Sequence, residues 1–180
     1  MSLNLLEKIK YECSEFIQCS ESLPLVKTLK KNPANFKKVK VRTKSKKNDF
    51  IEAFNEAFSE EYKNIHGRSI FCNGSHTITE LNEYERIYVF PINGFKYLYN
   101  PNVTFVEEYK KLYETLNSSM SGVDVESLFI DMIEYSYKSV QTSFKDALFS
   151  QKEIIIYGIP YYYAVKVNKF PHYSDLIDLF

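Results

Sequence analysis

Apolar side chains recur at helical spacing in four stretches of this sequence. The stretches cover residues 5–17, 49–66, 105–116 and 125–148, and in each the Leu, Ile, Val, Phe and Tyr residues fall mostly three or four positions apart. In the second stretch Asp49 can cap the helix, Glu52 completes a capping box and Gly67 suits the end. We therefore predict four helices, with a further brief one over residues 76–82.

A second pattern, of alternating or short continuous apolar runs, predicts strands. Val39 and Val41 alternate with Lys and Arg over residues 36–43. Short apolar runs bounded by turn residues follow at 69–72, 86–90, 95–99, 153–157 and 161–167. Strands mixed with helices in this way indicate an α+β fold, in which residues 1–35 form a helical N-terminal extension and residues 36–180 form one domain.

The composition fits one folded domain with an aromatic core. A chain of 180 residues has an ordinary domain length, and its 15 Tyr and 14 Phe predict a core of large rings and at least one ring-lined concavity. Three cysteines, an odd number, argue against a disulfide framework. Since the N-terminus lacks a signal-peptide layout and no apolar run is long enough to span a membrane, we expect a cytoplasmic protein.

The net charge is zero, but the positive charges are concentrated in one basic segment. Residues 22–48 contain ten Lys or Arg residues and no Asp or Glu. Such a segment attracts the phosphates of a nucleotide or nucleic acid, or an acidic protein, although a solvated Lys-rich loop has the same composition. The residues expected to contact a partner are Lys37, Lys38, Lys40, Lys44, Lys46 and Lys47.

The sequence shows no common metal or nucleotide motif. His66, Cys72 and His76 lie close together, but their spacing matches no common zinc pattern and a fourth ligand is missing. Neither GxGxxG nor GxxxxGK[ST] occurs. We therefore expect no metal, and a nucleotide site, if the chain has one, must be of another kind.

Three separated segments carry groups suited to nucleotide chemistry. The first is Val41-Arg42-Thr43-Lys44, the second spans residues 67–75, and the third is Gln151-Lys152-Glu153 at the start of an apolar strand. In their order and separation these segments resemble the motifs of the ADP-ribosyltransferase superfamily, in particular its compact poly-ADP-ribose-polymerase-like and diphtheria-toxin-like branch. The resemblance covers residues 39–167.

This resemblance implies a fold, a cofactor and a set of site residues. The implied fold is a split antiparallel β-sandwich with flanking helices, and the implied cofactor is NAD. Arg42, with Thr43 beside it, stands at the first motif, where this branch carries a His and other branches an Arg. Phe71 takes the aromatic position of the second motif and Ser75 its serine. Gln151 and Glu153 resemble the third, catalytic motif.

The chemistry of NAD cleavage gives these residues tasks. Breaking the bond between nicotinamide and ribose passes through an oxocarbenium-like state, which the carboxylate of Glu153 would stabilise. The guanidinium of Arg42 would hold the pyrophosphate or ribose, and the ring of Phe71 or Tyr84 would stack on nicotinamide. Gln151 would orient the attacking nucleophile.

Three hypotheses stay open, because each of these residues also has a purely structural interpretation, such as Ser75 as a helix cap. The first is an NAD-dependent ADP-ribosyltransferase that modifies a macromolecule, with a protein as the expected acceptor. The Lys, Asn, Ile, Tyr and Phe bias suits an AT-rich genome such as that of a bacteriophage, where such enzymes modify host proteins. The second is a non-catalytic binding or inhibitor protein of the same fold that engages a partner through its Lys-rich segment. The third is a sequence-independent nucleic-acid binder.

Overall fold

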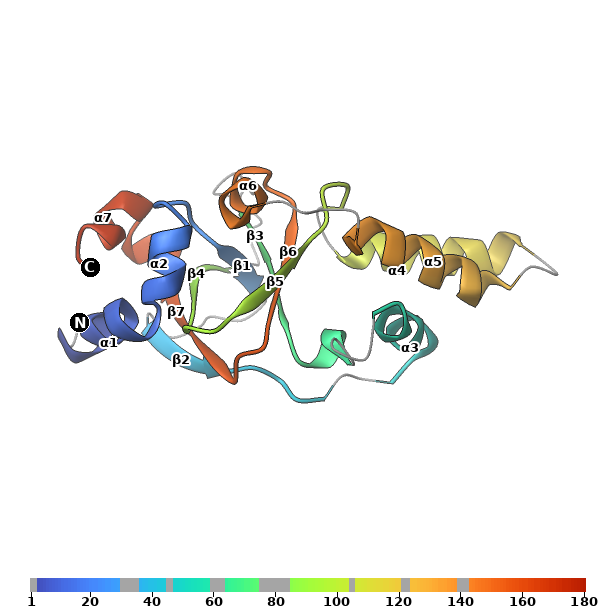
Figure 1. Cartoon of the computed structure of the whole chain (residues 1–180), viewed down its shortest axis with the longest axis horizontal. Coiled ribbons are helices and arrows are strands. Elements are labelled where there is room, and N and C mark those ends of the chain that lie inside the picture. The colour runs from blue at the N-terminus through green and yellow to red at the C-terminus, as the bar shows by residue number, and fades with distance from the viewer. Residues whose placement is uncertain are drawn as a thin grey trace.

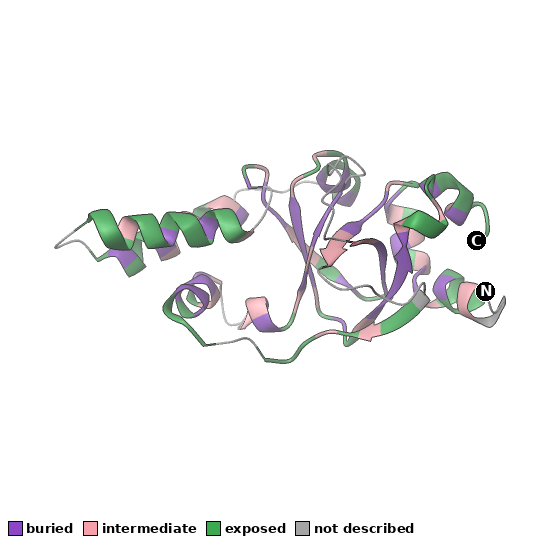
Figure 2. Cartoon of the chain, turned by 180° about the vertical axis from the view of Figure 1, so that it is seen from behind, coloured by how far each residue is buried: buried purple, intermediate pink, exposed green. Residues whose placement is uncertain are grey.

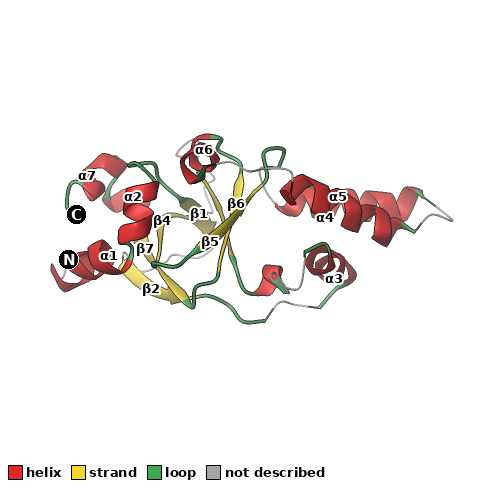
Figure 3. Cartoon of the chain, viewed as in Figure 1, coloured by secondary structure: helices red, strands yellow, loops and turns green. Residues whose placement is uncertain are grey.

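The protein is built around a seven-stranded antiparallel sheet with helices at both ends (Figure 3). The computed structural model describes residues 3–29, 36–44, 47–58, 64–74, 85–103, 106–120, 124–138 and 143–180. The strands are β1 (Val26–Leu29), β2 (Phe36–Lys40), β3 (Ile70–Asn73), β4 (Glu85–Pro91), β5 (Lys96–Tyr99), β6 (Glu153–Tyr157) and β7 (Tyr161–Lys166). The sequence prediction of an α+β fold is confirmed.

The sheet consists of two halves that meet at one residue pair. Its order is β2-β7-β4-β1-β3-β6-β5, and neighbouring strands run antiparallel. β1 pairs with β3 only through Val26 and Asn73, whereas the other neighbours share four or five pairs each. The strand β1 lies inside residues 1–35, which we expected to be a helical extension, so this segment takes part in the sheet.

The helices form two groups at opposite ends of the sheet (Figure 1). Near the two termini lie α1 (Leu3–Glu12), α2 (Ser14–Cys19) and α7 (Tyr173–Ile177). At the other end lie α3 (Asp49–Glu56), α4 (Val106–Ser119) and α5 (Val125–Lys138). Between the groups, α6 (Phe144–Phe149) lies near β3 and β6. The described residues also form two short 3₁₀ turns, η2 (Ile65–Gly67) and η3 (Val167–Lys169).

Two hydrophobic cores correspond to the two helical groups. The first surrounds the ring of Phe16, which meets the rings of Phe90, Phe95 and Phe144 at centroid distances of 5.6, 6.2 and 5.9 Å. The second packs α3, α4 and α5 against Ile155 of β6. Because successive residues of a strand face opposite sides, the continuous apolar run of β6 supplies both cores. Figure 2 shows the buried strands between the more exposed helices.

Three predicted helices are divided or shortened in the structure. The stretch 5–17 holds α1 and α2, which are separated at Cys13. The stretch 49–66 holds α3 and, after residues 59–63, which lie outside the described part, η2. Asn48 rather than Asp49 caps α3, since its Oδ1 accepts a hydrogen bond of 2.8 Å from the amide of Ile51. The stretch 125–148 holds α5 and α6 as separate helices. The brief helix expected over 76–82 lies outside the described residues.

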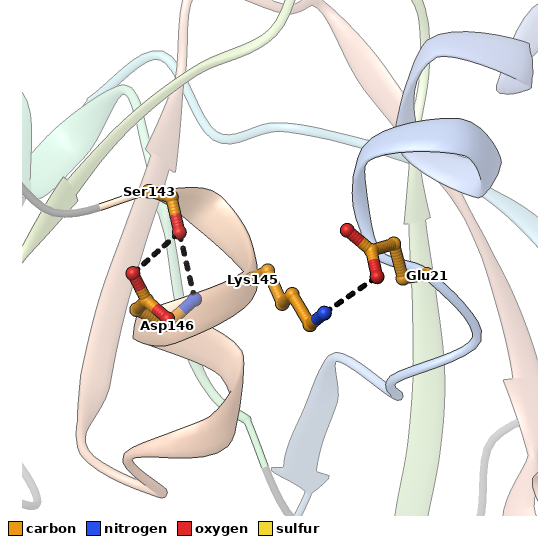
Figure 4. Close-up of polar contacts among 4 residues, drawn as sticks. All are labelled: Glu21, Ser143, Lys145 and Asp146. Atoms are coloured by element: carbon orange, nitrogen blue, oxygen red, sulfur yellow. Dashed lines mark hydrogen bonds and ion pairs between the residues drawn. The ribbon is translucent and has the colours of Figure 1, made fainter.

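A serine caps the start of α6, beside a solvent-exposed ion pair (Figure 4). Ser143 Oγ accepts a hydrogen bond of 3.2 Å from the amide of Asp146 and donates one of 2.6 Å to its carboxylate. Lys145 Nζ lies 2.6 Å from Glu21 Oε2, in the turn after α2. Because α6 has only six residues, its own backbone hydrogen bonds cannot hold it, so it depends on the packing of its buried Phe144, Ala147 and Leu148, and the cap adds to this.

The cap leads to a first testable prediction. We expect Ser143→Ala to lower the free energy of unfolding by about 1 kcal/mol, because one amide of the first turn of α6 loses its acceptor. Urea denaturation measures this loss. Lys145→Ala, which removes only a solvent-exposed ion pair, is the control and is expected to have little effect. A larger loss in the lysine variant would show that the ion pair, and not the cap, anchors the helix.

Candidate functional site

Glu153 opens β6 and is enclosed by the helices α4 and α5. Its side chain is 2 % exposed. Tyr137 of α5 donates a hydrogen bond of 2.8 Å to Oε1, and the amide of Val106 at the start of α4 donates one of 2.6 Å to Oε2. Burial raises the pKa of Glu153 to about 7, although both hydrogen bonds act to lower it. The carboxyl group therefore titrates near neutral pH.

The enclosure continues as a buried polar network. Asn100, which is fully buried, donates from Nδ2 to the hydroxyl of Tyr109 at 2.5 Å. Its backbone amide donates to the carbonyl of Glu153 at 3.3 Å. Burial raises the pKa of Tyr137 well above its ordinary value, and the nearby Glu153 carboxylate adds to this rise, so the Tyr137 hydroxyl stays a donor. The network joins β6 to the first turn of α4 and the last turn of α5.

Gln151 lies two residues before Glu153 but in a different environment. Its side chain is exposed, and its backbone has a left-handed φ of 64°, which non-glycine residues rarely adopt. The turn places Gln151 on the surface while Glu153 enters the interior. The two residues of the expected catalytic motif therefore do not share one exposed surface.

A cavity with a cationic rim, which we call the basic cleft, lies against the half-sheet β2-β7-β4-β1. Its volume is about 390 Å³. Leu29, Val39, Ile87, Tyr162 and Ala164 contribute to its apolar wall, and its cations are Lys27, Lys37, Lys40 and Arg42. Among the described residues that line it there is no Asp or Glu. An apolar wall with several cations suits a ligand that joins a ring to phosphate groups.

A second cavity, which we call the larger cavity, adjoins the basic cleft. Its volume is about 590 Å³, and the two cavities share Lys40, Val41 and Arg42 as lining residues. Thr43 and Arg68 line only the larger cavity. The exposed side chain of Arg42 therefore stands where the two cavities meet.

The structure brings together only some of the residues that the sequence indicated. Arg42 and Phe71 line the basic cleft together, and Lys37 and Lys40 line it too. Glu153 lines neither cavity. Lys38 points to the rings of β7, and the exposed Lys44 and Lys47 line neither cavity. Ser75, Tyr84 and Lys46 lie outside the described residues.

Lys27 is a candidate site residue that the sequence prediction treated only as part of the basic segment. It lies on β1, at the centre of the sheet, lines the basic cleft and donates from Nζ to the carbonyl oxygen of Phe71 at 2.9 Å. Its charge also acts to lower the pKa of Glu153. The signal in the sequence was the short run Leu25-Val26 followed by Leu29, which reads as a strand once the nearby lysines are set aside.

His66 forms the aromatic wall of the basic cleft together with Phe71. The two rings lie 5.4 Å apart, and the ring of Phe54 lies 6.1 Å from the imidazole. Burial lowers the pKa of His66, which keeps the imidazole neutral at neutral pH. Its Nδ1 is buried and has no hydrogen-bond partner in the described part of the chain. His66 lines the cleft, and the nitrogens of a neutral imidazole can donate or accept a hydrogen bond.

Metal binding requires several ligands placed together, and nucleophilic chemistry requires an ionised thiol, so these requirements bear on His66, Cys72 and His76. They contain no group of three or more His, Cys, Asp or Glu side chains placed to hold a metal ion. Cys72 is buried, and burial raises the pKa of its thiol to about 12, so the thiol stays protonated. His76 lies outside the described residues.

Comparison with known proteins assigns no family to this fold and site. The chain matches no family model, no curated protein and no solved structure. In the described part of the chain, no helix combines the length and the apolar character needed to cross a bilayer. The fold and the cleft define an α+β protein with a divided antiparallel sheet and a cationic cleft on one half of it.

Proposed function

We propose that this protein is an NAD-dependent ADP-ribosyltransferase that holds its dinucleotide in the basic cleft. The observation that carries the proposal is the lining of this cleft, where Lys27 and Arg42 lie with the ring of Phe71. Cations fit the pyrophosphate of NAD, and apolar and aromatic walls fit its planar rings. The division of the sheet at Val26 and Asn73 supports the split fold that the sequence resemblance implies.

In the proposed reaction the acceptor displaces nicotinamide from the ribose. The bond between nicotinamide and C1′ breaks, and its electron pair leaves with nicotinamide. A nucleophile of a macromolecular acceptor, with a protein side chain as the expected case, forms the new bond to C1′ and loses a proton. The carboxylate of Glu153 would stabilise the positive charge on the ribose, which requires that Tyr137 and the start of α4 release it.

The enclosure of Glu153 favours a second candidate function, binding without turnover. Both carboxylate oxygens accept hydrogen bonds from α4 and α5, and the side chain is 2 % exposed. In this alternative Glu153 is a structural acceptor that joins β6 to the two helices, and the basic cleft retains an anionic ligand or the acidic surface of a partner. The chain would then act as a binding or inhibitor protein.

One experiment separates the two candidates. The protein is incubated with a cell lysate and NAD labelled in its adenylate phosphate, and NAD binding is measured in parallel by calorimetry. For the transferase we expect label on macromolecules, and a loss of about 100-fold in Glu153→Gln. Glu108→Gln, an equal change at an exposed position in the first turn of α4, is the matched control and should keep its activity.

The other outcomes are equally decisive. If NAD binds, Arg42→Gln weakens the binding and no label is transferred, the protein binds without turnover and the second candidate stands. If NAD neither binds nor is consumed, the basic cleft is not a dinucleotide site and the transferase proposal fails. If Glu153→Gln still transfers label, the protein is a transferase but Glu153 is not its catalytic carboxylate.

A further inference from the structure

The larger cavity combines cations with aromatic rings. Its cations are Lys40, Arg42 and Arg68, and its rings are those of Tyr157 and Tyr161. No acidic side chain occurs among the described residues that line it. Since Lys40, Arg42 and Arg68 are exposed, their charges are available to a ligand from solution. The cavity is therefore an anion site with planar surfaces beside it.

The cations stand on two different walls. Lys40 ends β2, and the amide of Val41 donates to the carbonyl of Pro160 at 2.9 Å, so the extended backbone continues to Arg42. Positions two residues apart on such a backbone are separated by about 6.6 Å. Arg68 follows η2, whose turn is closed by a hydrogen bond of 3.2 Å from the Arg68 amide to the carbonyl of Ile65. An anion in the cavity would meet positive charge from both sides.

We propose that the larger cavity binds single-stranded nucleic acid. A polynucleotide presents several phosphates and a planar base beside each of them, which fits the three cations of this cavity and the ring of Tyr157. An acidic peptide of Asp and Glu residues offers carboxylates but no planar face for the ring of Tyr157. This site goes beyond the proposed function, since Arg68 and Tyr157 line only the larger cavity and the binding does not require NAD.

The chain offers a matched control on the same strand. Lys38 lies on β2 two residues before Lys40, but its Nζ stands 3.4 Å from the centre of the Tyr161 ring. It does not line the larger cavity. Lys38→Gln and Lys40→Gln therefore remove the same charge from the same exposed strand, and only the second removes it from the proposed site.

The test is the binding of fluorescent oligodeoxythymidylate, followed by anisotropy over a range of salt concentrations. Each phosphate contact with a single strand contributes about −0.7 to the slope of log affinity against log salt, so three cations predict a slope of about −2. Between 50 and 200 mM salt the affinity is then expected to fall about 20-fold. Arg68→Gln and Lys40→Gln should each reduce the slope by about 0.7, and Lys38→Gln should leave it unchanged.

Three results would overturn the proposal. The first is a reduction of the salt slope in Lys38→Gln equal to that in Lys40→Gln, which would show that the whole of β2 attracts the oligonucleotide without a specific site. The second is binding of polyglutamate in place of the oligonucleotide, which would assign the cavity to an acidic protein. The third is binding of neither probe. Because Arg68 does not line the basic cleft, Arg68→Gln should keep NAD binding. A failure of the nucleic-acid proposal and a failure of the dinucleotide proposal are therefore observed separately.

Discussion

The variant Gly74→Ala is expected to lose about 3 kcal/mol of unfolding free energy, because the added methyl group would overlap the backbone of α6. A Cβ atom on Gly74 would lie 1.9 Å from the carbonyl oxygen of Leu148 and 2.4 Å from its carbonyl carbon. No side-chain rotation relieves this overlap, since the three nearest atoms all belong to the main chain of Leu148. The helix must move, and with it the packing of its buried Phe144 and Leu148.

Gly94→Ala is the matched control for this loss. Gly94 has a φ of 82°, and nothing lies within 4 Å of the position of its added Cβ. Its variant carries only the cost of an unfavourable backbone conformation, which is about 1 kcal/mol. Urea denaturation of both variants separates the cost of the steric overlap from the cost of an unfavourable backbone conformation. Equal losses in the two variants would mean that α6 shifts freely away from β3, and the close contact would then have no role in stability.

The close contact at Gly74 also matters for the candidate site. Gly74 follows Asn73, the residue of β3 that pairs with Glu153 on one side and with Val26 on the other. A displacement of α6 at this point therefore acts on the start of β6 and on the junction of the two half-sheets. We infer that the position of Glu153 depends on how α6 packs against Gly74, as well as on α4 and α5.

The strands that could be predicted are those whose signal is local. β4, β6 and β7 are runs of apolar residues bounded by turn residues, and the structure has each within a residue of its predicted bounds. β1 has only four residues and lies inside the basic segment, close to Pro24. Its apolar signal, Leu25-Val26 followed by Leu29, is short, and its strand conformation depends on β3 and β4, which follow more than 40 residues later, so the local sequence favoured a loop or helix as readily as a strand.

The candidate site shows the same limit at the level of single side chains. The sequence located Glu153 at a strand start, and the structure has it there. Its burial comes from Tyr137 and the amide of Val106, which are 16 and 47 residues away and carry no sequence signal as its partners. The pairing of Arg42 with Lys27 and His66 around one cleft is likewise a product of strand order.

The burial of Glu153 leads to the second large effect, a stability that depends on pH. Burial raises the pKa of Glu153 in the folded state to about 7, above its ordinary value of 4.5. Between these two values the folded state binds more protons than the unfolded state, so stability falls as pH rises through this window. The contribution is fully present below pH 4.5 and is lost above about pH 7. A shift of this size corresponds to about 3 kcal/mol.

Glu153→Gln isolates this contribution, because glutamine resembles the protonated acid and does not titrate. Relative to the native protein, the variant is expected to gain about 3 kcal/mol between pH 4 and pH 8, as measured by urea denaturation at each pH. Carboxyl groups whose folded pKa is lowered, such as Glu12 beside Tyr163, act in the opposite direction but are common to both proteins and cancel in the difference. A difference that stays constant with pH would mean that the pKa of Glu153 is not raised in the folded protein, so that the hydrogen bonds from Tyr137 and Val106 fully offset the effect of burial. The ionised form would then be held at no cost near neutral pH, which is the form that the transferase reaction needs.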